Sequence, residues 1–171
     1  MSEIAIQLER RSVQDLLEQV SVTRELFAIL DPADDARVLA KVKELEGDRA
    51  VSLFDGYAAA KYVAIAPWLV GLDAERLGWL LETPPGVPWG IVVESGSELR
   101  VLRRQLQRSL TARFPDGKSA FFRFYDPRIL TSLLSAASPP ELATIYGEHV
   151  RSFMTIEGSA VTRWALRRSP S

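Results

Sequence analysis

The sequence predicts a fold of the α/β (α+β) class, a single compact domain in which helices pack on a mixed β-sheet. Short apolar runs alternate with segments of helical periodicity through the first half of the chain, which is typical of strand-helix-strand units with parallel strands. Two hairpin patterns, at 111–125 and 150–166, predict antiparallel strands in the second half. A chain of 171 residues is long enough to bury a stable core without disulfides or metals.

The N-terminal segment is expected to be helical. Residues 3–20 have apolar side chains at helical spacing, and Ser12 is the expected N-cap of the helix. We therefore divide the chain into an N-terminal helical extension, residues 1–24, and a domain over residues 25–171.

The first half of that domain alternates apolar strands with helices. Acidic residues within 31–35 precede the first of these helices, where the helix dipole favours negative charge, and Asp55-Gly56 is a turn signal. In chain order we expect strands at 26–30, 50–54 and 64–70, separated by helices that end at Leu45 and Tyr62, and then a helix at 75–81.

The second half begins with a proline-rich turn and an apolar strand, and it ends in a hairpin centred on Gly158. Ser138 is the expected N-cap of the last helix. The elements expected here are strands at 89–94, 111–114, 119–125, 150–157 and 160–166, and helices at 98–110, 127–137 and 139–146.

The most informative stretch is the aromatic run in the second strand of the first hairpin. Alternation along a strand places one set of side chains on one face and the rest on the other, namely Phe121, Arg123 and Tyr125 against Phe122 and Phe124. Because both faces carry large side chains, both are expected to be covered. The run therefore predicts a central strand of the sheet.

The end of this run carries two signals. Asp126 is expected to cap the next helix, with Pro127 at its first position.

Arg123 lies between aromatic side chains. A guanidinium taken out of water there needs a carboxylate or an aromatic ring to stack on, and Asp31, Asp55 and Asp126 are candidate partners. One interpretation is an internal ion pair that fixes how the strand meets the helix, and the other is direct contact with a partner protein.

The run Phe-Arg-Phe-Tyr-Asp-Pro-Arg at 122–128 resembles the effector adaptor, or effector-chaperone, family of the bacterial type VI secretion system. Weaker landmarks of that family follow in the expected order between about residue 25 and about residue 150, and they are Leu26–Asp31, Ser52–Gly56, Ala66–Val70, Trp89–Ile91 and a helix carrying Leu99, Leu102, Arg103, Leu106 and Leu110. The resemblance implies a structural motif made of Phe122, Arg123, Phe124, Tyr125, Asp126, Pro127 and Asp55.

The resemblance also implies a function. Members of that family bind a toxic effector, usually near its N-terminal or membrane-active region, and load it onto the VgrG spike. We therefore expect an adaptor that performs no catalysis and whose partner is an effector, with direct contact to VgrG left open. An immunity protein, which would neutralise the active site of a toxin, is an alternative.

Tryptophan and arginine side chains dominate the hot spots of protein interfaces. On this basis the candidate contacts with a partner are Trp164, Arg163, Trp89, Arg123 and Arg128. The final hairpin is expected to be the best-exposed place for cargo, which would dock as an added strand or as a helix in a groove.

A catalytic alternative rests on Asp31, Asp34, Asp35 and Asp55, which lie at or after strand ends, where open α/β sheets place active sites. With a divalent cation they would suit a metal-assisted phosphoesterase. Helix capping and an Asp-Gly turn explain the same residues, and the single histidine, His149, suits a loop. No Walker-type glycine loop is present, so we predict no catalytic residue, metal or cofactor.

Composition limits the remaining classes. The absence of cysteine excludes a disulfide framework and a thiol nucleophile. The balance of 21 basic and 22 acidic residues favours neither nucleic acid nor an anionic membrane as partner. The longest apolar segment, Tyr62 to Leu72, is about half of a ~20-residue membrane span, and the first residues lack the pattern of a secretory signal. We therefore expect a cytoplasmic protein.

Overall fold

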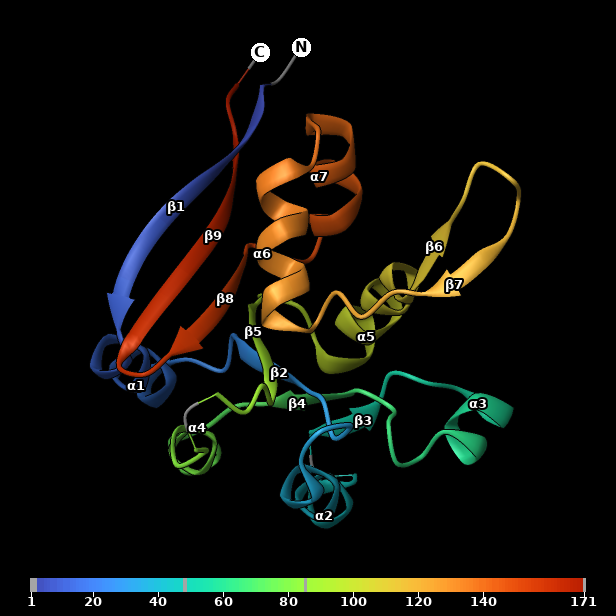
Figure 1. Cartoon of the computed structure of the whole chain (residues 1–171). Helices are drawn as coiled ribbons and strands as arrows, with labels where there is room; N and C mark the ends of the chain where they lie inside the picture. The colour runs from blue at the N-terminus through green and yellow to red at the C-terminus, as the bar shows by residue number, and fades with distance from the viewer. Residues whose placement is uncertain (1–2, 48, 85, 171) are drawn as a thin grey trace.

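Seven strands pair into one sheet in the computed structural model, which describes residues 3–47, 49–84 and 86–170 (Figure 1). These strands are β1 (Ile4–Ser12), β2 (Leu26–Leu30), β3 (Ala50–Ser52), β4 (Trp68–Gly71), β5 (Gly90–Glu94), β8 (Ser152–Glu157) and β9 (Ala160–Arg168). Their order across the sheet is β1-β9-β8-β5-β2-β4-β3. Two further strands, β6 (Thr111–Arg113) and β7 (Ser119–Phe121), form a separate two-stranded sheet.

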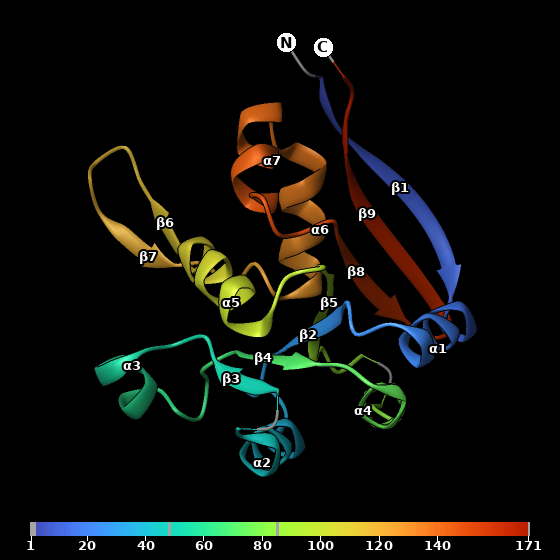
Figure 2. The same ribbon diagram turned by 180° about the vertical axis from the view of Figure 1, so that it is seen from behind.

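Helices cover both faces of the seven-stranded sheet (Figures 1 and 2). Their bounds are α1 Val13–Val22, α2 Ala36–Leu45, α3 Gly56–Lys61, α4 Ala74–Leu81, α5 Leu99–Gln107, α6 Pro127–Ala136 and α7 Pro139–Tyr146, with a 3-10 turn, η1, at Arg108–Leu110. Helices α1, α2 and α4 pack on one face, and α5, α6 and α7 pack on the other. The predicted fold class, helices and strands in one compact domain, is confirmed.

The apolar pattern of the central strands explains this layering. In β2, Phe27 and Ile29 join the core beneath α5, α6 and α7, whereas Leu26, Ala28 and Leu30 join the core beneath α1, α2 and α4. All five residues of β2 are buried, as are all five of β5. A strand buried on both faces reads as a continuous apolar run, which is how both appear in the sequence.

The parallel pairing expected in the first half is wrong, because every strand pair of the described residues is antiparallel. Strands β2 and β3, which α2 connects, run in the same direction, but β4 lies between them. Strands β4 and β5, which α4 connects, are likewise separated by β2. Each of these two helical connections therefore skips one position in the sheet, and an antiparallel strand fills it.

The helix expected over residues 3–20 forms only in its second half. Residues 4–12 are strand β1, which pairs with β9 from Ile4 opposite Arg168 to Ser12 opposite Ala160. Ser12 does cap the following helix, since its hydroxyl accepts a hydrogen bond from the Asp15 amide at 3.1 Å. The expectation of a wholly helical extension over residues 1–24 is therefore wrong for the part that β9 pairs as a strand.

The central strand expected at 119–125 is also wrong. Strand β7 ends at Phe121, and the hairpin of β6 and β7 projects from the body of the protein (Figure 1). Phe121 is 63% exposed, whereas Phe124 and Tyr125 are adjacent in sequence and both buried. The strict alternation of a strand stops after Phe121, because the chain turns inward there to enter the core.

Other local predictions are confirmed. Asp126 caps α6 by accepting from the Arg128 amide at 2.9 Å, and Pro127 is the first helical residue. Ser138 caps α7 in a capping box with Glu141. Strands β8 and β9 form the expected C-terminal hairpin. Among the helices of the described residues, none has both the length and the apolar character needed to cross a bilayer.

Candidate functional site

Arg123 pairs with Asp31, one of the three carboxylates expected as its partner. Asp31 directly follows β2 and is buried, and its second oxygen accepts from the Ala33 amide at 3.0 Å. The hydrogen bond with Asp31 raises the pKa of the Arg123 guanidinium above its usual value. The pair thus joins the end of a central strand to the segment that leads from β7 into α6, which is the internal role expected for it.

Asp126 and Arg128 form a second pair two residues further on. The Arg128 side chain donates to the two carboxylate oxygens of Asp126 at 3.0 and 2.7 Å. These bonds hold the pKa of Asp126 below its usual range, and the carboxylate is only 5% exposed. The Arg128 side chain is 74% exposed, so its guanidinium also faces solvent.

The aromatic members of the motif belong to the core. Phe124 packs edge-on against Tyr125 and against Phe153 of β8, with ring centroids 5.7 and 6.4 Å apart. Burial raises the pKa of Tyr125 to about 12. Phe122 is half-buried at the edge of the same core. The motif therefore anchors the chain between the hairpin and α6.

A mostly apolar cavity of about 470 Å³ lies beside Phe122 and Phe124. Its other walls come from the end of α5 and from α6 and α7, and they include Gln105, Arg108, Leu133, Ile145 and His149.

One buried side chain, Gln105, fixes the wall of this cavity. Its amide nitrogen donates to the Tyr146 carbonyl at 2.7 Å, and its oxygen accepts from the His149 amide at 3.0 Å. The Nδ1 atom of His149 lies 2.8 Å from the Ser97 hydroxyl. These contacts place His149 in the loop after α7, as predicted.

Asp55 has a structural role. It is held by α5, because Arg103 forms an ion pair with one carboxylate oxygen and Gln107 donates to the other at 2.8 Å. These hydrogen bonds lower the pKa of Asp55 below its usual value. Arg103 and Gln107 also donate to the carbonyls of Ser52 and Leu53, at 2.7 and 3.0 Å. Helix α5 thereby holds the connection between β3 and α3 in place.

The carboxylates of the catalytic alternative are engaged by arginines and by a helix N-terminus. Asp31 pairs with Arg123, whose guanidinium also lies 3.9 Å from Asp34. Asp55 pairs with Arg103, and Asp35 caps α2 by accepting from the Arg37 amide at 2.9 Å. Nowhere in the described part of the chain do three or more His, Cys, Asp or Glu side chains gather so that they could hold a metal ion. The arrangement supports capping and pairing roles for these residues.

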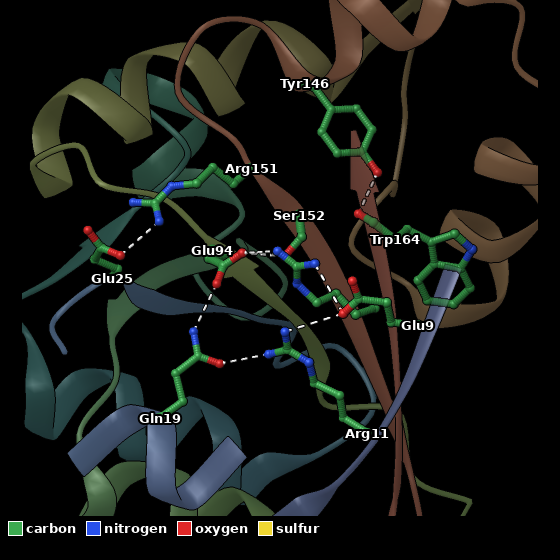
Figure 3. A network of polar contacts seen from close by, with 10 residues as sticks. Glu9, Arg11, Gln19, Glu25, Glu94, Tyr146, Arg151, Ser152 and Trp164 are labelled. Atoms are coloured by element: carbon green, nitrogen blue, oxygen red, sulfur yellow. Dashed lines mark hydrogen bonds and ion pairs between the residues drawn. The ribbon is translucent and has the colours of Figure 1, made fainter. Parts of the chain in front are cut away.

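The two tryptophans expected at a partner surface are buried instead. Trp164 is 6% exposed and Trp89 is 7% exposed. The carbonyl of Trp164 accepts from the Tyr146 hydroxyl at 2.8 Å (Figure 3). The final hairpin was expected to be the best-exposed docking place, and this is wrong for Trp164, because α7 and the N-terminal strand cover that side of β9.

Arg163 enters a buried polar network at the junction of β1, α1 and the sheet. Its guanidinium bonds to Glu94 at 2.6 Å and lies 3.3 Å from Glu9. Gln19 donates to Glu94 at 2.8 Å, and Ser152 donates to it at 3.1 Å (Figure 3). Burial alone would raise the pKa of Glu94, but the hydrogen bonds outweigh it and the pKa is lowered. The network ties the N-terminal segment to the central strands.

An aromatic cluster with two exposed members, which the sequence did not reveal, lies where the β6–β7 hairpin meets α3. We call it the aromatic surface and define it by Phe54, Tyr57, Lys61, Tyr62 and Phe121. Phe54 and Phe121 stack with centroids 5.2 Å apart, and Tyr62 meets Phe121 edge-on at 6.3 Å. Tyr57 is 76% exposed. The signal available in the sequence was the pair Tyr57 and Tyr62, which lie in α3 and directly after it, in a helix without a buried residue.

A comparison with known protein families matches residues 26–144, more than half of the chain, to Domain of unknown function (DUF4123). This chain belongs to the DUF4123 family. The family is known as an effector adaptor, or chaperone, domain of the type VI secretion system, and it is generally non-catalytic. No curated protein and no solved structure matches the chain.

Most of the contacts described above lie within the DUF4123 region. The Arg123–Asp31 pair and the whole aromatic surface fall within it. Trp164 and Arg163 fall outside it, on the strand that pairs with β1. Two exposed rings of the DUF4123 region, those of Tyr57 and Phe121, belong to the aromatic surface.

Proposed function

We propose that this protein binds one type VI effector and hands it to the VgrG spike, without a catalytic step. The observation that carries the proposal is the match of residues 26–144 to a family of type VI effector adaptors. The cargo would be bound before delivery, in the cytoplasm of the producing cell.

The arrangement of charges supports binding over catalysis. The carboxylates of the catalytic alternative cap helices or pair with arginines, so their negative charges already have partners within the fold. Exposed aromatic side chains, by contrast, contribute strongly to protein interfaces. Tyr57 and Phe121 are 76% and 63% exposed. We therefore infer that the protein holds its partner through non-covalent contacts with exposed side chains, and not through a chemical reaction.

Among the five partner contacts expected from the sequence, Arg128 and Arg123 remain candidates. Their side chains are 74% and 39% exposed, and both lie in the motif between β7 and α6. Arg163 is paired with Glu94, and Trp89 and Trp164 are buried, so we propose no direct contact with the partner for these three residues.

The experiment that tests the proposal is affinity purification of the tagged protein from its own bacterium, with mass spectrometry of the proteins that copurify. We expect one large effector, and VgrG if the spike is contacted directly. A second measurement follows delivery of that effector to neighbouring cells after deletion of the adaptor gene. Delivery should stop while the producing cell stays healthy.

Two outcomes would contradict the proposal. A strain that poisons itself after the deletion would identify an immunity protein, because only an immunity protein is needed to survive the toxin. Unchanged delivery of every effector would remove the carrier role altogether.

A further inference from the structure

Strand β1 forms the longest unpaired edge of the sheet. It is the first strand in the sheet order, and Figures 1 and 2 show no helix or strand running along its outer side. It has nine residues, and its pairing with β9 is continuous, without a bulge. The other free edges are short, since β3, β6 and β7 have three residues each. A long, regular edge is a template for pairing with a further strand.

The backbone groups of every second residue of β1 point to this open side. The Ser169 amide donates to the Glu3 carbonyl at 2.9 Å, and the Val13 amide donates to the Ser159 carbonyl at 3.0 Å. The odd-numbered residues of β1 therefore bond to β9, and the N–H and C=O groups of the even-numbered residues face outward. None of these outward groups has a hydrogen-bond partner among the described residues over Ile4, Ile6, Leu8 and Arg10.

The spacing of these groups determines what can cover them. The open stretch ends at Ser12, because its amide donates to the Asp15 carboxylate at 3.0 Å. Before that point, free donors and acceptors repeat along four residues with the period of a strand. An extended segment meets such a row with its own backbone hydrogen bonds, whereas a helix has already used its backbone groups internally. The occupant of this edge is therefore a strand.

The edge is complementary to itself. When two copies of β1 pair in antiparallel orientation with Gln7 opposite Gln7, Ile4 faces Arg10 and Ile6 faces Leu8 of the other copy. All four outward residues of both copies then form hydrogen-bonded pairs. A shift of two residues in one direction leaves Arg10 beyond the end of the other strand, and in the opposite direction it sets Ile4 against the capped Ser12. One register therefore satisfies the whole open edge.

The side chains on both faces suit this register. Ile4 and Ile6 pack against the core of the protein, but Leu8 on the same face is 63% exposed. In the paired arrangement Leu8 lies opposite Ile6 of the second copy, which covers it. On the other face, Arg11 of one copy lies opposite Glu3 of the other. Opposite charges in directly facing positions stabilise a strand pair.

We propose that two copies of the chain pair edge to edge through β1, antiparallel and centred on Gln7, so that their two sheets become one. The interface is isologous, because each copy contributes the same strand. This inference concerns the assembly of the protein and does not depend on the proposed adaptor function.

Light scattering during size-exclusion chromatography of the full chain measures the assembly. A concentration of about 100 μM populates the dimer even at a dissociation constant of about 10 μM, so we expect a mass of twice the 19.1 kDa of one chain. Leu8→Pro should reduce the mass to that of one chain, because it removes an outward N–H and leaves the bonds to β9 in place. Leu8→Val keeps the N–H and an apolar side chain, and it should remain a dimer. Melting curves show that each variant folds.

A single introduced cysteine tests the register, since the chain has none of its own. The two copies of Gln7 would form a non-hydrogen-bonded pair with Cα atoms about 4.5 Å apart, which a disulfide can span. Gln7→Cys should therefore give a cross-linked dimer under mild oxidation, seen on a non-reducing gel. Ala5→Cys is the matched control on the same face. Its two copies would lie roughly 13 Å apart along the strands, and it should not cross-link.

A monomer at about 100 μM overturns the inference. A dimer that Leu8→Pro leaves intact also overturns it, because the interface would then lie elsewhere. The same holds for a dimer in which Gln7→Cys gives no cross-link, or in which Ala5→Cys cross-links as readily. If Leu8→Pro fails to fold, the two cysteine variants decide, since both keep every backbone N–H.

Discussion

The Arg123 guanidinium donates a hydrogen bond to the carboxylate of Asp31, which joins two segments 92 positions apart in sequence. Asp31 is 3% exposed in its side chain, and Arg123 is 39% exposed. The ion pair therefore brings the segment after β7 onto the end of β2, although the hairpin before it projects outward. Two residues before Arg123, the ring of Phe121 stacks on Phe54 with centroids 5.2 Å apart.

Arg123→Ala should lower the free energy of unfolding by about 2 kcal/mol, because Asp31 would remain buried without its cation. The loss is below that of a fully buried pair, since the guanidinium is partly solvated. Urea denaturation measures it. Arg100→Ala, on the exposed face of α5, is the control and should change stability by no more than about 0.5 kcal/mol. Equal losses in the two variants would contradict the role given to the Arg123–Asp31 pair.

Glu94 should make stability depend on pH. Its pKa in the folded protein is lowered, so its contribution is fully present above the ordinary glutamate pKa of about 4.3 and is lost as the pH falls through the folded pKa. Glu94→Gln should be less stable than the parent at neutral pH, because Arg163 loses the more buried of its two charged partners, Glu94 and Glu9. The difference between parent and variant should shrink as the pH falls below about 4. A difference independent of pH, in urea denaturation at several pH values, would exclude this linkage.

Gly90→Ala should prevent stable folding. Gly90 has φ +135°, and an added Cβ would overlap the backbone carbonyl oxygen of Ile29 on the paired strand. We expect a loss above about 3 kcal/mol or insoluble protein. Gly78→Ala is the matched control, since Gly78 lies in α4 and an added Cβ there would meet only open space. This variant should gain about 0.5–1 kcal/mol in the free energy of unfolding. Thermal melting distinguishes the two, and a well-folded Gly90→Ala protein would contradict the close approach of β5 to β2.

Tyr146→Phe should destabilise the protein by about 1–2 kcal/mol, since the buried Trp164 carbonyl would lose its hydrogen-bond donor. Tyr57→Phe removes a hydroxyl from a side chain that is 76% exposed, and it should leave the melting temperature unchanged. If both substitutions were neutral, the contact between α7 and β9 would not contribute to stability.

Local features of this fold were predictable from the sequence. Ser12, Asp126 and Ser138 cap their helices as expected, and both hairpins form at the expected turns. Such features depend on neighbours within about four residues, because caps and turns are closed by short-range hydrogen bonds. The family could also be recognised from the sequence, because the motif at 122–128 is a continuous run of residues.

The candidate site was only partly predictable. Asp31 was one of three possible partners for Arg123, and only the folded chain brings these two side chains together. The aromatic surface was missed because Phe121 was assigned to a buried central strand, whereas β7 pairs only with β6. Trp164 was expected to be exposed, but strand pairing with β1 and packing against the core cover it.

The sequence by itself determined most of the helices, with their caps and turns, and which family the chain resembles, but it predicted a helix where residues 4–12 form β1. The tertiary structure alone decided which strands are neighbours, since β4 separates β2 from β3 and β1 pairs with β9 from the opposite end of the chain. The physical reason is the separation along the chain between the residues that make each contact. Helix caps and turns are satisfied within one or two turns of backbone, whereas strand order and the exposure of Phe121 depend on contacts between residues far apart in the sequence.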